Sequence, residues 1–205
     1  MKKIKKLRLI NWHFFEDQEI NFSDINVITG ENGTGKSTIL DAIHYLQSGG
    51  TCKFNMAANT LSHGRTVENY LKARIGVENK EFLREQSDII GHIAMEYFNT
   101  LLGKTYILGC VIQLVSNQLS SVDFYEIKGD KWNDALFFTE NGNVRSFDSL
   151  YREGQAQRLT ISRVGQPRSS QVARAKAVRE ALGVPEKYDT LFTKAMSFEI
   201  GRAHV

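Results

Sequence analysis

The residues best suited to chemistry form one short run near the amino terminus, from Gly30 to Ser37, with the sequence GENGTGKS. Their spacing matches G-x-x-x-x-G-K-[ST], the pattern of a phosphate-binding loop. Three glycines let the backbone curl so that successive amide N–H groups point at a single anion. A lysine and a hydroxyl at the end of the run add a long cation and a ligand for Mg²⁺. The run therefore predicts a site for a nucleoside triphosphate with its magnesium.

Individual positions of the loop have distinct expected roles. Lys36 is long enough to reach the β- and γ-phosphates and is a candidate catalytic cation, whereas Ser37 is the candidate metal ligand. Thr38 is well placed for the α-phosphate. The other candidate ATP-binding residues are Gly30, Glu31, Asn32, Gly33, Thr34 and Gly35. A glycine-rich turn that matches the pattern by chance is the alternative interpretation.

The segments on either side of the loop must position it. Ile25, Val27 and Ile28 are expected to form a short buried strand that enters the loop. Residues 38–46 then predict a helix, because their apolar side chains recur at helical spacing, and a Ser-Gly-Gly sequence at 48–50 ends it. Strand, glycine loop and helix together are the context that the motif requires.

The rest of the chain predicts mainly antiparallel strands. Residues 2–10 alternate and predict a strand with one wet face, and 14–22 predict its return with Phe14, Ile20 and Phe22 inward. Period-two patterns predict a meander, and an Asn-Gly pair at 141–142 predicts a turn. Ser169 or Ser170 is expected to cap the helix that runs to Leu182. The expected strands are 92–98, 105–115, 122–127 and 135–139; the expected helices are 67–73, 146–152, 169–182 and 188–198, with a charged loop at 78–91.

The composition sets outer limits on the class of protein. The chain has 205 residues, of which 41% are hydrophobic, enough for one real core, and its net charge of +3 is too weak to establish a nucleic-acid partner. Cys52 and Cys110 are isolated, which argues against a metal or disulfide framework and fits a reducing cytoplasm. The longest apolar run, residues 107–115, is too short to span a bilayer, so no membrane partner is expected.

The motifs together resemble the amino-terminal head of SMC-type ATPases. The resemblance is carried by residues 7–12 (LRLINW) and by residues 25–43, which contain the phosphate loop. Within this family, the chain most resembles the condensin-like, MukB-like ATPase subunit of Wadjet plasmid-defence systems. Three segments carry this finer resemblance: residues 54–59 (FNMAAN), 65–71 and 191–198.

The resemblance implies the α/β fold of a P-loop NTPase, and specifically half of an ABC-ATPase-like head. This half would contain a parallel core strand, an antiparallel β-meander and flanking helices. Residues 1–199 would be the amino-terminal half of the head, and residues 200–205 are interpreted as a non-native tail. The implied cofactors are ATP and Mg²⁺. The implied partners are a second copy of the head, double-stranded DNA, and kleisin-like and accessory subunits, with DNA loop extrusion or related remodelling as the outcome.

The chain departs from the complete pattern in one respect. It contains no aliphatic strand ending in Asp-Glu, no Leu-Ser-Gly-Gly motif in a suitable place and no heptads. The general base and the motif that acts on the partner head would therefore lie on a carboxy-terminal half. By this interpretation the present chain binds ATP without sustained hydrolysis, and its phosphate-loop strand leaves an unpaired apolar edge.

Several other residues have two interpretations. Arg65 is a candidate catalytic arginine that reaches the nucleotide or the partner head, or else a solvated loop residue. Trp12 and His13 could flank the adenine, although a tryptophan there more often closes a core. Basic residues at 2–8 and 163–179 could contact DNA phosphates, but ordinary wet surfaces are preferred.

Two other functions share the same phosphate loop. RecF-like proteins and OLD-family nucleases begin similarly, and the nucleases add a metal-binding domain. A nucleotide-dependent clamp that holds DNA without hydrolysis is the third possibility. Heptads beyond residue 198 would favour the motor, and a carboxylate-rich domain would favour the nuclease.

Overall fold

The computed structural model describes residues 2–51, 54, 66–75, 81–129, 132–166 and 170–188. The described strands are β1 (Lys2–Trp12), β2 (Phe15–Asn21), β3 (Arg74–Ile75), β4 (Glu81–Phe82), β5 (Ile89–Asn99), β6 (Lys104–Val115), β7 (Gln118–Lys128) and β8 (Thr160–Arg163). The helices are α1 (Lys36–Gln47), α2 (Val67–Leu71), α3 (Phe147–Ala156) and α4 (Gln171–Leu182), with 3₁₀ turns η2 (Asp134–Leu136) and η3 (Glu186–Tyr188).

One twisted sheet organises these elements. Six strands lie in the order β2-β1-β5-β6-β7-β8, and every described pairing within it is antiparallel. The predicted meander is therefore confirmed, with strands that are longer than the apolar pattern indicated. β8 was not predicted, because its four residues are too few to display a periodicity.

The strand predicted at 135–139 is wrong. The chain forms η2 there, followed by a single bridge between Phe138 and Val144. Arg145 Nε donates to the carbonyls of Ala135 and Phe138, at 2.8 and 3.1 Å. An arginine side chain thus satisfies backbone acceptors that a strand neighbour would otherwise have to satisfy.

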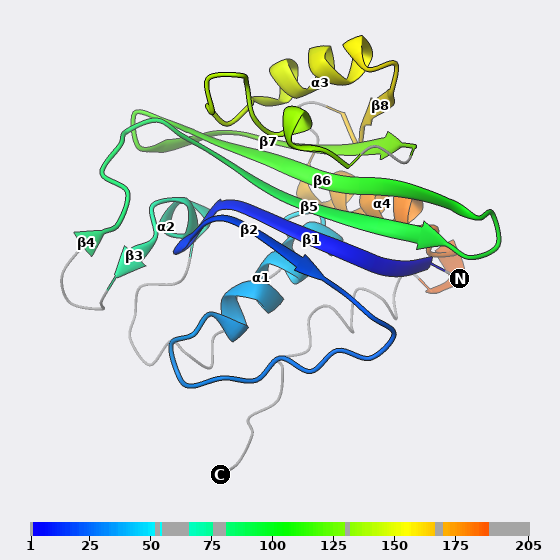
Figure 1. Cartoon of the computed structure of the whole chain (residues 1–205), viewed down its shortest axis with the longest axis horizontal. Coiled ribbons are helices and arrows are strands. Elements are labelled where there is room, and N and C mark those ends of the chain that lie inside the picture. The colour runs from blue at the N-terminus through cyan, green and yellow to red at the C-terminus, as the bar shows by residue number, and fades with distance from the viewer. Residues whose placement is uncertain are drawn as a thin grey trace.

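Helices cover both faces of the sheet, as Figure 1 shows, with α3 on one side and α1 and α4 on the other. On the α1 side, Leu7, Leu9 and Met95 of the sheet are fully buried beneath Ala42 and Leu46 of α1. Alternate strand residues form the second core on the α3 side, which is why β1, expected to have one wet face, is buried on both faces from Leu7 to Ile10.

The α3 side also encloses two charged or titratable groups. Arg8, expected on the wet face of the first strand, is buried and pairs with Asp17 at 2.8 Å and with Asp134 at 2.6 Å. Its hydrogen bonds to Asp17 raise the pKa of the guanidinium. His92 is buried nearby, and its Nε2 lies 2.7 Å from the carbonyl oxygen of Arg145.

The strand expected to enter the glycine loop is not formed. Residues 26–30 have no regular structure, and Ile25 and Val27 are 85% and 79% exposed. No described strand lies beside them to accept their backbone hydrogen bonds, and an isolated strand is not stable. The parallel core strand of the predicted fold is therefore absent from the described sheet. Phe14, predicted inward, is also partly exposed, whereas Ile20 and Phe22 pack against the core.

The helix predictions agree with the structure where it can test them. Ser146 and Ser170 cap α3 and α4 through their hydroxyls, and α4 ends at Gly183 in the left-handed region. The helix expected at 188–198 lies outside the described residues, apart from Tyr188 at the end of η3. Within the described parts of the chain, no helix has the length and hydrophobicity needed to cross a bilayer.

Candidate nucleotide-binding site

The glycine loop leads directly into an uncapped helix. Gly30, Gly33 and Gly35 have φ values of 151°, 88° and 93°, and Gly35 is the N-cap residue of α1. No side chain caps this helix, and its first turn carries no acidic residue. The first backbone bond runs from the amide of Ile39 to the carbonyl of Gly35, so the amides of residues 36–38 have no acceptor within the helix. This arrangement suits an anion at the helix start.

Lys36 lies across the loop in the structure. Its ammonium donates to the carbonyls of Gly30 at 2.7 Å and Glu31 at 2.6 Å, while the Thr34 hydroxyl donates to the same Glu31 carbonyl at 2.9 Å. These bonds close the loop on itself. The cation is therefore held a short distance from the helix start, where the unpaired amides lie.

The aromatic rings of Phe14 and Phe15 pack against the end of the loop at Gly35. A Cβ built on Gly35 would lie 2.5 Å from the Phe14 ring and 3.0 Å from the Phe15 ring, whereas one built on Gly33 would meet nothing within 4 Å. The turn that carries both rings is clamped by Arg84, whose guanidinium donates to the carbonyls of His13 and Phe15. Burial lowers the pKa of this guanidinium.

A buried aromatic cluster attaches the first turns of α1 to the sheet. Trp12 stacks on Tyr70 with ring centroids 4.4 Å apart, and its indole N–H donates to the Thr38 carbonyl at 3.1 Å. The Tyr70 hydroxyl donates to Asp41, which is buried one turn further along α1. Trp12 is therefore a core residue, and its exposed fraction of 1% leaves no surface for an adenine.

The predicted site residues are only partly brought together. The structure places Gly30, Lys36 and Ser37 at one end of α1, with Thr38 buried beneath them. Arg65 lies outside the described residues, and so do the segments 55–59 and 191–198 that narrowed the family resemblance.

Several basic residues considered as DNA contacts have partners within the protein. Lys3 pairs with Asp24 at 2.7 Å, and Lys6 pairs with Glu19 at 3.0 Å. Arg174, in the second basic stretch, donates to the carbonyl of Gly49 at 2.9 Å. The preferred interpretation of these stretches as ordinary surface charges is wrong for Arg8 and Arg179, which are buried.

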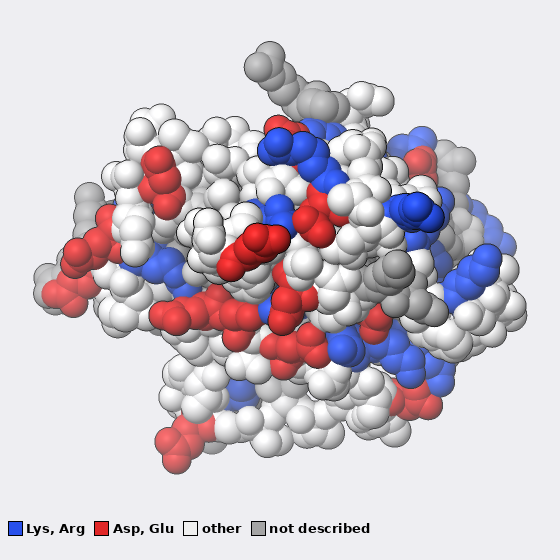
Figure 2. Space-filling view, turned by 45° about the horizontal axis from the view of Figure 1, so that its top comes forward, with Lys and Arg blue, Asp and Glu red and all other residues white. Residues whose placement is uncertain are grey.

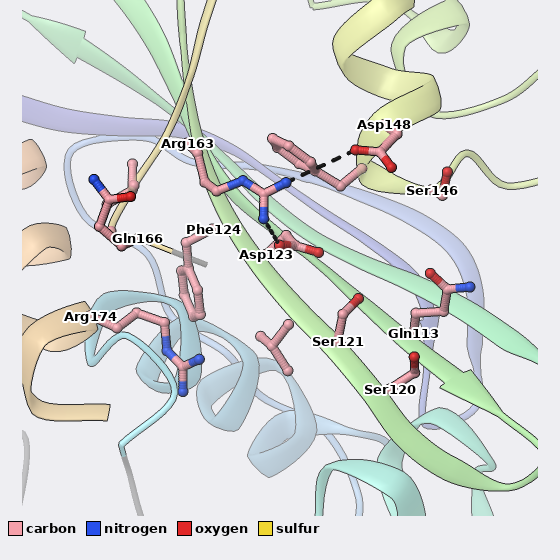
Figure 3. Close-up of a pocket in the computed structure, with 14 residues that line it drawn as sticks. Gln113, Ser120, Ser121, Asp123, Phe124, Ser146, Asp148, Arg163, Gln166 and Arg174 are labelled. Atoms are coloured by element: carbon pink, nitrogen blue, oxygen red, sulfur yellow. Dashed lines mark hydrogen bonds and ion pairs between the residues drawn. The ribbon is translucent and has the colours of Figure 1, made fainter. Parts of the chain in front are cut away.

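A polar cavity of about 590 Å³ is lined by residues of β6, β7, β8, α3 and α4. Figure 3 shows Arg163 reaching Asp123 and Asp148 across it, and its guanidinium also lies 4.1 Å from the centre of the Phe147 ring. None of the predicted nucleotide-binding residues lines this cavity.

Sequence reasoning missed the residues that support the loop. Arg84 lies in what was predicted to be a charged loop, and Phe15 was only one apolar residue of an expected strand. The pair Asp41 and Tyr70 is separated by 29 positions in the sequence. No local pattern distinguishes these residues, since each acquires its role from a contact with a distant segment.

Comparison with known proteins agrees with the geometry of the loop. Residues 4–61 match a family model described as the P-loop containing region of an AAA domain. The fold is α/β with a P-loop, a mostly antiparallel sheet and flanking helices, and it is consistent with an ABC-ATPase-like head.

Three curated relatives extend this result. The chain is 51% identical over 43 residues to the DNA double-strand break repair Rad50 ATPase of Thermoplasma acidophilum, and 30% identical over 89 residues to the structural maintenance of chromosomes protein 6 of Schizosaccharomyces pombe. It is 42% identical over 48 residues to the DNA replication and repair protein RecF of Desulfitobacterium hafniense.

These similarities are local. They cover 20%, 43% and 23% of this chain, and 5%, 8% and 13% of the respective relatives. The chain therefore has a P-loop region similar to regions of the Rad50, SMC6 and RecF proteins, and it spans a small part of each relative's length.

Proposed function

We propose that this chain is the ATP-binding amino-terminal half of an SMC-type ATPase head that acts on DNA. The observation that carries the proposal is the uncapped start of α1, where a left-handed glycine, unpaired amides and Lys36 converge. The names of the relatives, which refer to DNA repair, DNA replication and chromosome maintenance, support DNA as the partner.

The residues present fit a triphosphate with Mg²⁺. Gly33 has open space above it, and the amides of residues 36–38 point to the same end of α1. Residues 30–38 would hold the phosphates through these amides and Lys36, and Ser37 would be the protein ligand of the metal. Bound Mg²⁺ would supply neutralisation of phosphate charge, while the helix dipole and Lys36 add fixed positive charge.

The exposed segment before the loop supports the half-head part of the proposal. Ile25 and Val27 are apolar, exposed and paired with no described strand, which is what a sheet lacking its complementary strands would present. In the complete protein we expect a carboxy-terminal half to cover this segment and to supply the general base. Hydrolysis would then require that half and a second head, with Arg65 as a candidate contributor.

At a finer level, we place the chain with the condensin-like subunits of plasmid-defence systems. Residues 54–59 and 191–198 support this placement. It implies loop extrusion on plasmid DNA in the cytoplasm, with kleisin-like and accessory subunits as further partners.

The test is a titration of the protein with a fluorescent ATP analogue at millimolar Mg²⁺. Lys36→Ala should weaken binding at least about tenfold, because a charge-assisted contact to phosphate is lost. The matched control is Lys128→Ala, which removes a lysine from the far end of β7. Equal affinities of the Lys36→Ala variant and the wild type would refute the assigned site.

RecF-like function is the second candidate, and the RecF match is the observation that favours it. Both candidates share the phosphate loop, so the ATP titration does not separate them. The reading frame beyond residue 198 does: heptads sustained over hundreds of residues belong to the motor, and their absence to the RecF-like protein. A clamp that only holds DNA would show ATP binding without multiple turnovers in the complete assembly.

A further inference from the structure

The turn between β5 and β6 projects beyond the rest of the sheet. β1 reaches only as far as the pairing of Lys2 with Asn99, and β7 ends opposite Tyr106. Figure 1 shows the turn at the right-hand edge of the molecule, past its neighbours. Its tip carries Leu101 and Leu102, which are 85% and 68% exposed. Two adjacent leucines are thus presented to solvent at the end of a β-ribbon.

Hydrogen bonds fix the shape of this tip. The Asn99 side-chain oxygen accepts from the amides of Leu101 at 3.0 Å and Leu102 at 3.3 Å. The Gly103 amide donates to the Asn99 carbonyl at 2.9 Å, and its φ of 61° closes the turn. These bonds hold the backbone of the turn in the geometry that exposes both leucines. Their exposure is a property of the turn geometry.

The surroundings of the tip are basic. Among the described residues, the exposed lysines Lys5 and Lys104 form no ion pair, and Lys104 directly follows the turn. Lys5 lies over the ring of Phe98, next to Asn99. Figure 2 shows lysine and arginine side chains gathered toward the right-hand end of the molecule and acidic ones mainly toward the left and centre.

We propose that the β5–β6 tip is an apolar wedge that inserts Leu101 and Leu102 between base pairs of double-stranded DNA. Minor-groove proteins unstack a base step by inserting apolar side chains, leucine among them, while basic side chains contact the groove. Lys5 and Lys104 would contact the phosphates on either side, which adds affinity without sequence preference. The inference rests on the proposed function, because it assumes that DNA is the partner, and it assigns where and how the DNA is deformed.

A partner protein is the other occupant that two leucines could have. The charge around the tip favours DNA, since the exposed lysines Lys5 and Lys104 beside two apolar side chains complement a polyanion with apolar base faces. A pocket on a partner protein would bind the two leucines and would not require the lysines. The experiment therefore measures the leucines and the lysines separately.

The experiment uses a 30-base-pair duplex that carries 2-aminopurine, whose fluorescence rises when its base step is unstacked. The wild type should raise the fluorescence. Leu101→Ser combined with Leu102→Ser should abolish the rise and weaken binding, measured by anisotropy, by about tenfold. Lys104→Gln should keep the rise at saturation but lower the slope of log affinity against log salt by about one.

The control variant is Leu83→Ser, which removes a leucine that is 57% exposed beside β4, at the opposite end of the molecule. It should behave like the wild type. Unchanged affinity and fluorescence in the double leucine variant would overturn the wedge, including the case in which a protein covers the tip. ATP binding, measured in parallel, separates the two proposals: a wedge signal without ATP binding refutes only the ATP-binding head. Intact ATP binding without a leucine-dependent signal refutes only the wedge.

Discussion

The sheet and the phosphate loop differ in how many of their residues are buried and hydrogen-bonded within the described chain. Strands β5 and β6, and half of β1 and of β7, are buried on both faces, and each strand finds its hydrogen-bond partners within the described chain. Residues 23–34, by contrast, are exposed throughout, including Ile25 and Val27. The sheet is thus stabilised by its own packing, while the loop depends on a few contacts at its carboxy-terminal end. We expect a bound nucleotide, or a further part of the protein, to complete the loop.

The largest effect should come from the residue that joins the two regions. Trp12→Ala should lower the free energy of unfolding by about 3–5 kcal/mol, because it empties the centre of a fully buried aromatic cluster. It also removes the bond to the Thr38 carbonyl, so ATP affinity should fall with stability. Urea denaturation measures the first quantity. Leu83→Ala, at an exposed position, is the control, and a loss below 1 kcal/mol for Trp12→Ala would contradict the joining role.

The second effect is a pH dependence that belongs to the sheet alone. Burial lowers the pKa of His92 to about 4 from an ordinary value of 6.5. Between these pH values the unfolded chain binds a proton that the folded chain does not, so stability falls as the pH falls through this window. The loss should reach about 3 kcal/mol at pH 4 relative to pH 7.5.

His92→Gln isolates this contribution, because glutamine keeps an N–H donor for the Arg145 carbonyl and does not titrate. Denaturant titrations at pH 7.5, 6, 5 and 4 on both proteins measure the effect. If the free energy of unfolding depends on pH in the same way for the wild type and the variant, His92 is not the source of the pH dependence.

The third prediction compares two glycines of the loop. Gly35→Ala should cost about 1–3 kcal/mol, because its φ is left-handed and its new Cβ would strike Phe14 and Phe15. Gly33→Ala bears the backbone strain without the contact and should cost less, about 1 kcal/mol. Thermal unfolding of the two variants measures the difference. Equal losses would mean that the aromatic turn does not support the loop.

The smallest effect on stability should come from the exposed segment. Ile25→Ser combined with Val27→Ser should change the free energy of unfolding by less than about 0.5 kcal/mol, because neither side chain is buried. The same pair should reduce self-association, measured by light scattering, since an apolar unpaired segment is removed. The control is Leu7→Ser in the core of β1, which should unfold the sheet. A large loss from the double serine variant would show that the segment is packed after all.

The sequence by itself determined the local features of this protein. The glycine spacing, Lys36 and Ser37 identify a phosphate loop without any structure, because the motif is contiguous and its chemistry depends on residue types. The central strands of the meander, a helix that begins at Ser146 and a cap at Ser169 or Ser170 were likewise predictable. Their signals, alternation and side-chain capping, are confined to a few neighbouring positions.

Only the tertiary structure decided which segments have neighbours. Ile25, Val27 and Ile28 have an apolar pattern that predicts a buried strand, yet burial requires a partner strand that the described chain does not provide. Arg8 alternates like a surface residue, and two distant carboxylates make its burial tolerable. The support of Gly35 by the Phe14–Phe15 turn and Arg84 is equally non-local. Residue types set the chemistry here, whereas contacts between segments far apart in the chain set burial, and a linear pattern carries no information about such contacts.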